Sequence, residues 1–592
     1  QDWTLPEPNV SAYSDTLLSN AKSFSDVAMI VISRSGGEGA DLPEDMTAVV
    51  NGTYYDGTTY RAGTYDDSLN SGNDWDEGDH YLQLSNREED LVDMVCKNFG
   101  TVILVYNGAN AFELGFVNDY PQIKGVLWSA GQGHVGMMAL GEILSGKVNP
   151  SAKTIDTFVY DVKKTPWWNN FGDFNYTNME EFIYIQEFFG TVSKEIPAFV
   201  NYVEGIYVGY RFYETAAAEG LINYDEIVQY PFGYGLSYTT FTQTMGPITE
   251  SDGVISFDVT VTNTGSVAGK DVVEVYVNPP YTNGGIEKAS VNLVQFAKTG
   301  LLQPNAAEKV TISFPVEDIM SYDYLVNKAY VLEAGDYIIS IQSDSHTVLE
   351  SGVYTVDSTV VYGEGNKRSS DQIVATNQFD YANGGVTYLS RKDGFANYET
   401  ATAKPSSYEM SAESKATFVQ MDNYLKAEAT AADEDPNAGE VVTGKNQGIK
   451  LETLRGLDKD DPAWDTFMDQ LTLDEMNSVI SLGGYQTAAI QSVGKVRTND
   501  CDGPASINNN FTGVGSVGFP AATLIAATWS DELAYKFGDS IGTMADEMDT
   551  SGWYAPAMNI HRTAFAGRNF EYYSEDPILS GSIASKAVLG SQ

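Results

Sequence analysis

The sequence predicts a multidomain α/β protein, because its pattern changes three times along the chain. Residues 1–240 alternate short apolar runs with longer amphipathic stretches, residues 241–358 alternate apolar and polar positions, and residues 446–592 return to mixed helix and strand signals. A chain of 592 residues is also longer than one ordinary domain. We therefore expect an α/β layer domain, a small β-sandwich and a second β/α segment, in that order.

The first domain, residues 1–240, is expected to hold a parallel sheet covered by helices. Three runs are apolar on both faces and are separated by stretches long enough for helices. They are "VAMIVIS" at 27–33, "TVILVYN" at 101–107 and "GVLWSA" at 125–130. Polar, glycine-rich loops follow the first and third runs, without the lysine or the spacing of a phosphate-binding loop. Ligands bind where such loops meet at the carboxyl ends of strands, so a site is expected at this edge.

The second domain, residues 241–358, shows alternation of period two with turn residues between the runs. Examples are "ISFDVTVTN", "EKVTISFPV" and "GDYIISIQSD". Several short strands without a helical period predict an antiparallel sandwich of the fibronectin III or immunoglobulin type. No catalytic cluster stands out in it, so a structural spacer is favoured over a carbohydrate-binding module.

The rest of the chain is expected to be a linker followed by a second β/α segment. Residues 359–445 include "AEATAADEDPNAGE" and similar tracts with few apolar anchors, which are typical of a partly solvated linker lying across a neighbouring domain. From residue 446 the pattern changes: "DPAWDTFMDQLTLDEMNSVISL" has helical spacing, whereas "ATLIAATW" and "GWYAPAMNI" are predicted as strands.

Charge and composition restrict the possible partners. The chain has 34 basic and 81 acidic residues, a formal net charge of −47, which disfavours nucleic acid and anionic lipid and suits a neutral ligand. No apolar run is long enough for a membrane span, and the first residues lack the pattern of a signal peptide, which was either removed or never present. Cys96 and Cys501 lack metal-ligand spacing and are predicted to be buried thiols.

Four motifs resemble signatures of the glycoside hydrolase family 3 β-glucosidases. They are "ISRSGGEGAD" at 32–41, "PFGYGLSYTTF" at 231–241, "CDGPASI" at 501–507 and "APAMNIHRTAFAGRNFEYYSEDPILSG" at 555–581. The resemblance implies an α/β/α sandwich, then a fibronectin III-like β-sandwich, then part of a (β/α)₈ barrel. It also implies a rearranged order, because in the common arrangement of this family the barrel comes first.

The resemblance also implies three site residues. Glu38 matches the acid/base of a retaining mechanism, which needs two carboxyl groups, and partial burial of its loop would favour the protonated form. Asp502 and Arg568 match residues that bind hydroxyls of the terminal sugar, and a fixed guanidinium fork suits vicinal hydroxyls. Glu38 could instead be an ordinary loop residue, Asp502 a turn acid, and Arg568 an ion-pair partner of Glu571 or Glu575.

Some positions depart from the family pattern or invite other interpretations. Asn508 stands where relatives often carry an Arg, and "GADLP" replaces a frequent Asp-Arg pair, which leaves the sugar preference open. His134 and His561 have no second His or Cys ligand nearby and are predicted to be structural. Glu571, Glu575, Phe570, Tyr572 and Tyr573 are assigned structural roles. No metal and no cofactor are expected.

The resemblance places the Asp nucleophile outside this chain. Residues 446–592 are fewer than the about 250 of a complete (β/α)₈ barrel, and the family's nucleophile segment lies beyond "GRNFEYYSEDP". Relatives also have sandwich strands upstream of the Glu38 loop. A second polypeptide or a further chain segment is therefore expected to complete the barrel, and a homodimer is compatible with this.

The expected activity is that of an exo-acting β-glucosidase that retains configuration and acts on oligosaccharides or glucosides. Two alternatives remain: a β-xylosidase of the same family, and a noncatalytic glycan-binding subunit without the nucleophile. The family's use in digesting plant oligosaccharides favours a secreted or cell-associated bacterial enzyme.

Overall fold

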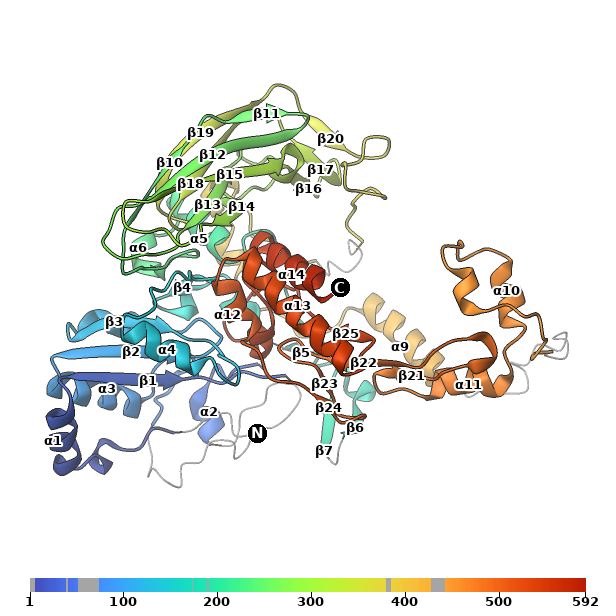
Figure 1. Cartoon of the computed structure of the whole chain (residues 1–592), viewed down its shortest axis with the longest axis horizontal. Helices are drawn as coiled ribbons and strands as arrows, with labels where there is room; N and C mark the ends of the chain where they lie inside the picture. The colour runs from blue at the N-terminus through green and yellow to red at the C-terminus, as the bar shows by residue number, and fades with distance from the viewer. Residues whose placement is uncertain are drawn as a thin grey trace.

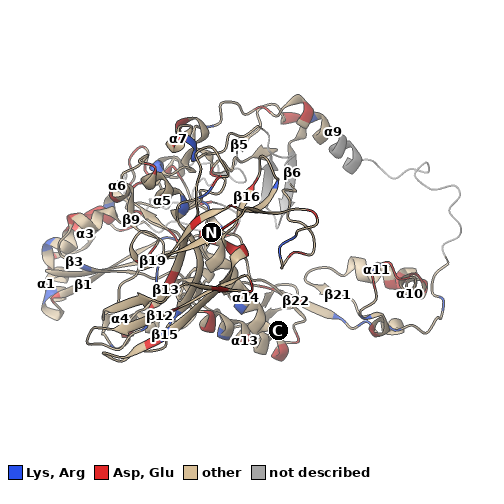
Figure 2. Cartoon of the chain, turned by 90° about the horizontal axis from the view of Figure 1, so that it is seen from above, with Lys and Arg blue, Asp and Glu red and all other residues tan. Residues whose placement is uncertain are grey.

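The computed structural model describes residues 6–38, 41–51, 74–172, 174–188, 191–378, 385–426 and 442–592. The acid-rich tract at 427–440 lies outside these ranges. The molecule consists of an α/β part, a β-sandwich and a C-terminal part. The helices α12 (Ala522–Ala527), α13 (Asp531–Glu547) and α14 (Pro577–Ser591) of the C-terminal part lie near the centre of the view (Figure 1). Acidic positions occur in each of these parts (Figure 2). None of the helices within the described ranges has the length and apolar content of a membrane span.

A parallel sheet forms the centre of the α/β part. Its strands are β1 (Val27–Ser33), β2 (Thr101–Asn107) and β3 (Ile123–Trp128), in the order β1-β2-β3. Ser33 pairs with Asn107, so β1 and β2 end side by side. The helices of this part are α1 (Asp15–Phe24), α2 (Met46–Val50), α3 (Asn86–Asn98), α4 (Met137–Leu144), α5 (Tyr210–Ala218) and α6 (Tyr224–Ile227). Helix α3 begins with a capping box formed by Ser85 and Glu88.

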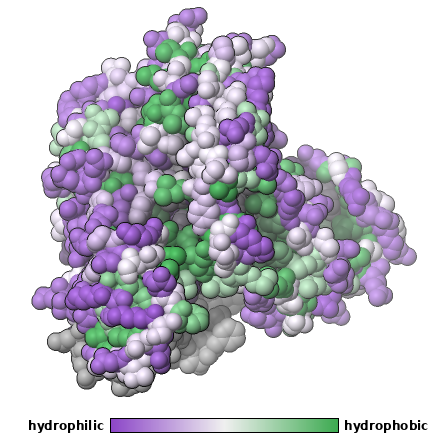
Figure 3. All heavy atoms as spheres, turned by 60° about the vertical axis from the view of Figure 1, so that its left-hand side comes forward, coloured by the Kyte–Doolittle hydropathy of each residue, from purple (hydrophilic) through white to green (hydrophobic). Residues whose placement is uncertain are grey.

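The edge strand β1 is less covered than its sequence predicts. Ile30 and Ile32 are buried, whereas Val27, Met29 and Val31 on the opposite face are 45%, 51% and 48% exposed. Figure 3 shows hydrophobic residues exposed among hydrophilic ones when this side of the molecule comes forward. Among the described residues, the prediction of burial on both faces is therefore wrong for β1.

Short two-stranded pairs complete the α/β part. They are β4 (Phe158–Val159) with β9 (Val228–Tyr230), β5 (Phe174–Asn175) with β8 (Ala198–Phe199), and β6 (Tyr184–Phe188) with β7 (Thr191–Glu195). All three pairs are antiparallel.

The β-sandwich consists of antiparallel sheets, as the period-two pattern predicts. One sheet holds β10 (Phe241–Met245), β11 (Thr249–Ser251), β12 (Val254–Asn263) and β15 (Ala307–Pro315), and another holds β13 (Val272–Asn278), β14 (Asn292–Lys298), β18 (Gly335–Gln342) and β19 (Val348–Val356). A small third sheet contains β16 (Ser321–Asp323), β17 (Ala329–Leu332) and β20 (Val360–Tyr362). Alternate side chains of β12, β13 and β18 form the core between the sheets.

The predicted linker contains the helices α7 (Lys392–Phe395), α8 (Tyr398–Ala401) and α9 (Ala412–Lys426), and its described residues contact the α/β part. The Asn170 amide donates to the carbonyls of Thr402 and Ala403, and the Arg391 side chain pairs with Glu219. These contacts hold the segment across its neighbour.

The C-terminal part contains one parallel strand pair. β22 (Thr498–Asp502) pairs in parallel with β25 (Gly552–Tyr554), and α12 (Ala522–Ala527) and α13 (Asp531–Glu547) lie between them in sequence. The other elements are α10 (Ala463–Met468), α11 (Leu473–Ser481), β21 (Gln486–Thr487), β23 (Asn508–Asn509), β24 (Val514–Gly515) and α14 (Pro577–Ser591). A β-α-β unit of this kind builds barrels, but the described residues do not form a closed one.

One strand prediction in this part is wrong. The run "ATLIAATW" forms the helix α12 and not a strand. Its alanines favour a helix, and most of its residues are buried, so its apolar character reflects a helix packed on several sides.

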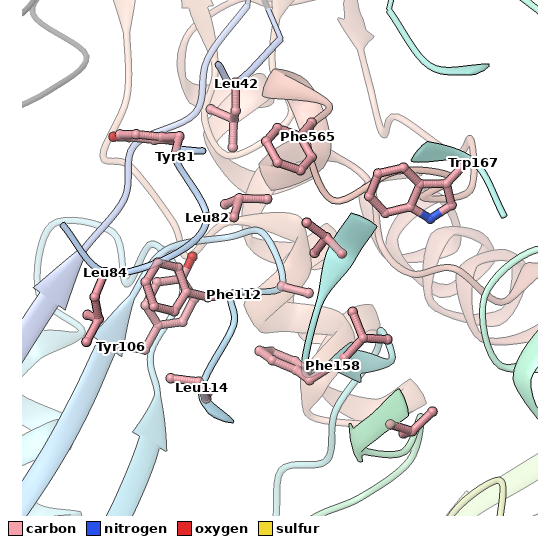
Figure 4. Packing of buried hydrophobic residues seen from close by; sticks show 14 of the residues in the cluster. Leu42, Tyr81, Leu82, Leu84, Tyr106, Phe112, Leu114, Phe158, Trp167 and Phe565 are labelled. Carbon is pink, nitrogen blue, oxygen red and sulfur yellow. The ribbon is translucent and has the colours of Figure 1, made fainter. Parts of the chain in front are cut away.

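The C-terminal part inserts a side chain into the core of the α/β part. Phe565 is 0% exposed and belongs to the same hydrophobic cluster as Leu42, Leu82 and Trp167 (Figure 4). Its ring also stacks on Phe171 with centroids 5.2 Å apart. The segment around Phe565 is thus fixed against the α/β part.

Candidate active site

The Glu38 loop begins at a buried arginine directly after β1. Arg34 forms a bidentate pair with Glu88, with Nη–Oε distances of 2.7 and 2.6 Å, and also donates to the carbonyls of Tyr81 and Gln83. Burial lowers the pKa of Arg34, but the charge and hydrogen bonds of Glu88 together with Tyr81 and Tyr106 outweigh burial and raise it, so the guanidinium stays charged. The root of the loop is therefore rigid.

The loop then runs along the segment that precedes Arg568. The Leu42 amide donates to the Phe565 carbonyl at 2.7 Å, and the Gly567 amide donates to Asp41 Oδ1 at 3.2 Å. Gly36 faces the Gly567 carbonyl so closely that a Cβ there would lie 2.6 Å from its oxygen. Two segments more than 500 positions apart in sequence are in direct contact here.

Arg568 projects from the short 3₁₀ helix Gly567–Glu571, between buried neighbours Gly567 and Asn569. Its Nη1 lies 3.2 Å from Glu38 Oε1, and its Nε donates to Glu571. The Arg568 and Glu38 side chains are 47% and 75% exposed, so the expected partial burial of Glu38 is wrong in this structure. Two of the three predicted site residues therefore meet across the interface, and Arg568 also forms the ion pair with Glu571 that the sequence left open.

Asp502 ends strand β22, at the carboxyl edge of the parallel pair. Its Oδ1 accepts from the Gly503 amide at 2.9 Å, and the Tyr485 hydroxyl donates to its Oδ2 at 3.4 Å. Asn508, which stands where relatives often have an Arg, pairs with Asp502 across β22 and β23 and is exposed. A partly exposed carboxylate at this edge can accept hydrogen bonds from a ligand.

Tyr485 donates a hydrogen bond to Asp502 and is also influenced by the charge of Glu38. The charge of Asp502, a small burial effect and the hydrogen bond to Asp502 raise the pKa of the Tyr485 hydroxyl, with a further contribution from the charge of Glu38. The Tyr485 ring also contacts Tyr554, with centroids 6.0 Å apart. Glu38 and Asp502 thus both act on the charge state of Tyr485, and Arg568 is the predicted residue that contacts Glu38 directly.

The second half of the "GRNFEYYSED" stretch is buried. Glu575 accepts hydrogen bonds from the Thr157 amide, the Thr157 hydroxyl and the Tyr210 amide, at 3.0, 2.7 and 2.8 Å. Asp576 pairs with Arg211 and caps α14 through the amides of Ile578 and Leu579. Arg568 faces solvent at one end of the stretch, and these acids anchor the other end to the α/β part.

His561 is buried beside this anchor. Its Nδ1 lies 2.7 Å from Asp156 Oδ1, and its Nε2 lies 3.0 Å from the Asn569 carbonyl. Burial lowers the pKa of His561, but the charge and hydrogen bond of Asp156 outweigh burial and raise it.

The remaining candidates from the sequence have structural surroundings. His134 Nδ1 accepts from the Gly518 amide at 3.2 Å, between the α/β and C-terminal parts. Cys96 and Cys501 are buried free thiols, which confirms that prediction. In the described ranges, no three His, Cys, Asp or Glu residues group in a way that could hold a metal ion.

Comparison with known proteins identifies the family. Residues 14–238 match the glycosyl hydrolase family 3 C-terminal domain, and residues 271–345 match the fibronectin type III-like domain. The chain is 32% identical to Beta-glucosidase A of Butyrivibrio fibrisolvens over 617 residues, covering 98% of this chain and 67% of that protein. This chain belongs to glycoside hydrolase family 3. In this family 3 chain, the domain named C-terminal comes before the fibronectin-like one.

Two further comparisons agree with this assignment. A Beta-glucosidase of Ruminococcus albus is 29% identical over 598 residues, covering 97% of this chain and 52% of that protein. A solved structure of a β-glucosidase from Paenibacillus barengoltzii has a TM-score of 0.68 at 23% identity, covering 100% of this chain and 57% of the other, and thus shares the fold. The chain spans about two thirds and about half of the lengths of these two curated relatives.

Two residues near the candidate site could not be identified from the sequence. Tyr485 directly precedes β21 in a loop without a recognisable motif, and Asn110 follows β2 in "NGAN". The rule that ligands bind at the carboxyl ends of parallel strands could have found Asn110, because its loop lies beside the Glu38 loop.

Proposed function

We propose that this chain supplies the acid/base and the sugar-binding residues of a retaining, exo-acting β-glucosidase. Its substrates are oligosaccharides or glucosides with a terminal β-D-glucosyl residue. The names of the family relatives support the β-glucosidase activity, and the motif resemblance supports the retaining mechanism and exo action.

In this proposal, Glu38 transfers a proton twice. First it protonates the glycosidic oxygen while an Asp carboxylate attacks the anomeric carbon, so the bond to the leaving group breaks and a glycosyl-Asp ester forms. The Glu38 carboxylate then takes a proton from water, whose oxygen bonds to the anomeric carbon and releases the Asp. This Asp belongs to barrel sequence outside the 592 residues, in a further chain segment or a second polypeptide.

Asp502 and Arg568 bind the terminal sugar in this proposal. A carboxylate accepts hydrogen bonds from neighbouring hydroxyls, and a guanidinium donates to them in a fixed geometry. The 3.2 Å contact between Arg568 and Glu38 carries the proposal, because it brings a sugar-binding group from one part of the chain to the acid from another.

The variant Glu38→Gln tests the role of the acid. We expect kcat/KM to fall by about 10²- to 10⁴-fold for substrates with a poor leaving group, and far less for 2,4-dinitrophenyl β-glucoside, whose departure needs little protonation. Glu142→Gln, at a partly exposed carboxylate on α4, is the matched control. Equal losses of kcat/KM on both substrates, or no loss on either, would contradict the assignment of Glu38. If the unaltered protein binds sugar but turns over neither substrate, the noncatalytic subunit is favoured.

The nucleophile can be tested by intact mass. We expect purified, active protein to contain a species well above 64.5 kDa or a second polypeptide. If 64.5 kDa is the only mass found in active material, the proposed location of the nucleophile is wrong.

Asn508 motivates one comparison between substrates. Asn508 pairs with Asp502 across two strands and is shorter than the Arg of many relatives. Because this difference alters the sugar pocket, β-xylosidase activity is the second candidate function. Initial rates on aryl β-glucoside and aryl β-xyloside decide between them, and a clear preference for the xyloside would favour the second.

A further inference from the structure

The loops that follow β1 and β2 emerge side by side. The two strands are parallel neighbours, with Ser33 opposite Asn107, and the Arg34 amide donates to the Asn107 carbonyl at 3.0 Å. The loop after β1 carries Glu38, and the loop after β2 carries Asn110. Both therefore face the same segment of the C-terminal part.

Asn110 connects this edge of the sheet to the segment that carries Arg568. Its side-chain amide donates to the carbonyls of Ala564 and Ala566, at 2.7 and 2.8 Å, across more than 450 positions of sequence. The residue is 1% exposed, and its own carbonyl accepts from the buried Tyr106 hydroxyl at 2.8 Å. Both protons of the side-chain amide are thus engaged in hydrogen bonds, and the Tyr106 hydroxyl holds the backbone carbonyl of Asn110.

The same side chain lies beside Gly36 of the Glu38 loop. A Cβ at Gly36 would lie 3.4 Å from Asn110 Oδ1 and 2.6 Å from the Gly567 carbonyl oxygen. The Gly567 carbonyl therefore leaves no room for a methyl group at Gly36, and Asn110 Oδ1 lies at contact distance from the same position. Glu38 lies two residues beyond one side of this contact, and Arg568 follows the other side directly.

We propose that Asn110 is a positioning residue that fixes the Glu38 loop relative to Arg568, and hence the acid relative to the bound sugar. This inference rests on the proposed function. General acid catalysis requires the acid within hydrogen-bond reach of the leaving oxygen, and a displacement of about 1 Å can cost about 10²-fold in rate. Asn110 itself need not touch the substrate.

The variant Asn110→Ala removes both hydrogen bonds and leaves space beside Gly36. We expect kcat for a poor leaving group, such as cellobiose or methyl β-glucoside, to fall by about 10-fold or more. We expect kcat for 2,4-dinitrophenyl β-glucoside to change by less than about 3-fold, because its leaving group depends little on the acid. All assays use the complete, active protein.

Asn170→Ala is the matched control. Asn170 is also 1% exposed and also donates to two backbone carbonyls, those of Thr402 and Ala403, but these belong to the linker segment. Its loss should lower stability to a similar degree and leave the ratio of the two kcat values unchanged. If both variants change the ratio equally, Asn110 has only a structural role and the proposal is wrong.

A second variant and a double-mutant cycle separate positioning from instability. Gly36→Ala forces the same two loops apart from the other side and should give the same selective loss, even if Asn110→Ala does not fold. In a Glu38→Gln background, Asn110→Ala should have little further effect on the poor leaving group, because it acts through Glu38. Additive losses would overturn the proposal.

Failure of the proposed function has a different signature. In that case the unaltered protein hydrolyses none of these glucosides, whichever leaving group they carry. Failure of the Asn110 proposal leaves the unaltered protein active, with Glu38→Gln selective for poor leaving groups and Asn110→Ala not selective.

Discussion

At the residue scale, the buried Glu575 of the "GRNFEYYSED" stretch makes the stability of the protein depend on pH. Glu575 is 6% exposed, and burial raises its pKa from 4.5 to about 7, with the neighbouring charge of Asp156 adding to the effect. The folded protein therefore holds a proton on Glu575 that the unfolded chain has released between these pH values. Its contribution to stability is complete below about pH 4.5 and is lost as the pH rises to about 7.

We expect the variant Glu575→Gln to reduce this pH dependence. One proton contributes a slope of up to about 1.4 kcal/mol per pH unit, and Gln cannot ionise. Gln also places an amide against the donors of Thr157 and Tyr210, so the variant should be less stable at every pH. Melting temperatures between pH 4.5 and 7.5 give the slope, and a slope equal to that of the unaltered protein would contradict the assignment. Glu142→Gln serves as the control.

Much of the candidate site follows at the residue scale from local motifs. Glu38 and Arg568 were identified from their own neighbours in sequence, and the structure brings them into contact. Asn110 was not identified, because it acts on a segment more than 450 positions away and its importance depends on the packing of two parts. Tyr485 lies 17 positions before its partner Asp502 and belongs to no recognisable motif.

At the element scale, the start of helix α5 is shaped to receive the Glu575 side chain. Gly209 precedes α5 with φ 60° and ψ −140°, a conformation that other residues rarely adopt. A Cβ at this position would lie 2.3 Å from the Glu575 carboxyl carbon. The glycine therefore permits both the backbone turn and the close approach of the C-terminal part.

We expect Gly209→Ala to weaken the docking of the C-terminal part on the α/β part. Backbone strain costs about 1–3 kcal/mol, and the displaced Glu575 adds to it. Protection of the Tyr210 and Thr157 amides in hydrogen exchange reports on this interface. Gly220→Ala is a useful comparison, because Gly220 also has a positive φ but nothing within 4 Å of its Cβ position. Equal effects of the two variants would show that strain alone is responsible.

Strands were easier to predict than their surroundings. The run at 101–107 is strand β2 as predicted, and "VAMIVIS" is β1, although one face of β1 is exposed. The run "ATLIAATW" is predicted as a strand but forms a helix, because an apolar stretch of this length is compatible with both a buried strand and a buried helix. The helices within the predicted linker depend on contacts with the α/β part, which its composition does not reveal.

At the scale of the whole molecule, a buried ion pair joins the α/β part to the β-sandwich. Lys153 Nζ lies 2.9 Å from Glu274 Oε1, and their side chains are 9% and 0% exposed. Lys153 also donates to the Gly233 and Ser343 carbonyls, and the Tyr276 hydroxyl donates to Glu274. The two parts therefore share one desolvated polar network.

We expect Lys153→Met to destabilise the protein by about 3–5 kcal/mol, because it leaves the Glu274 carboxylate buried without its partner. The double variant Lys153→Met/Glu274→Gln should recover part of this loss, since no charge is then stranded. Burial raises the pKa of Glu274 to about 8 despite Lys153, so denaturant unfolding at about pH 9, where the carboxylate is ionised, measures both. If the double variant is no more stable than the single one, lost packing and not the stranded charge explains the effect.

The contact between Gly36 and the Gly567 carbonyl also limits which parts of this protein and its relatives can be combined in a chimera. A chimera that takes its α/β part from one relative and its C-terminal part from another must bring together two loops that leave no space for a side chain at Gly36. The covalent order of the parts can vary, because the contact does not depend on chain connectivity. The two loops must instead be inherited as a compatible pair, so a productive crossover exchanges both or neither.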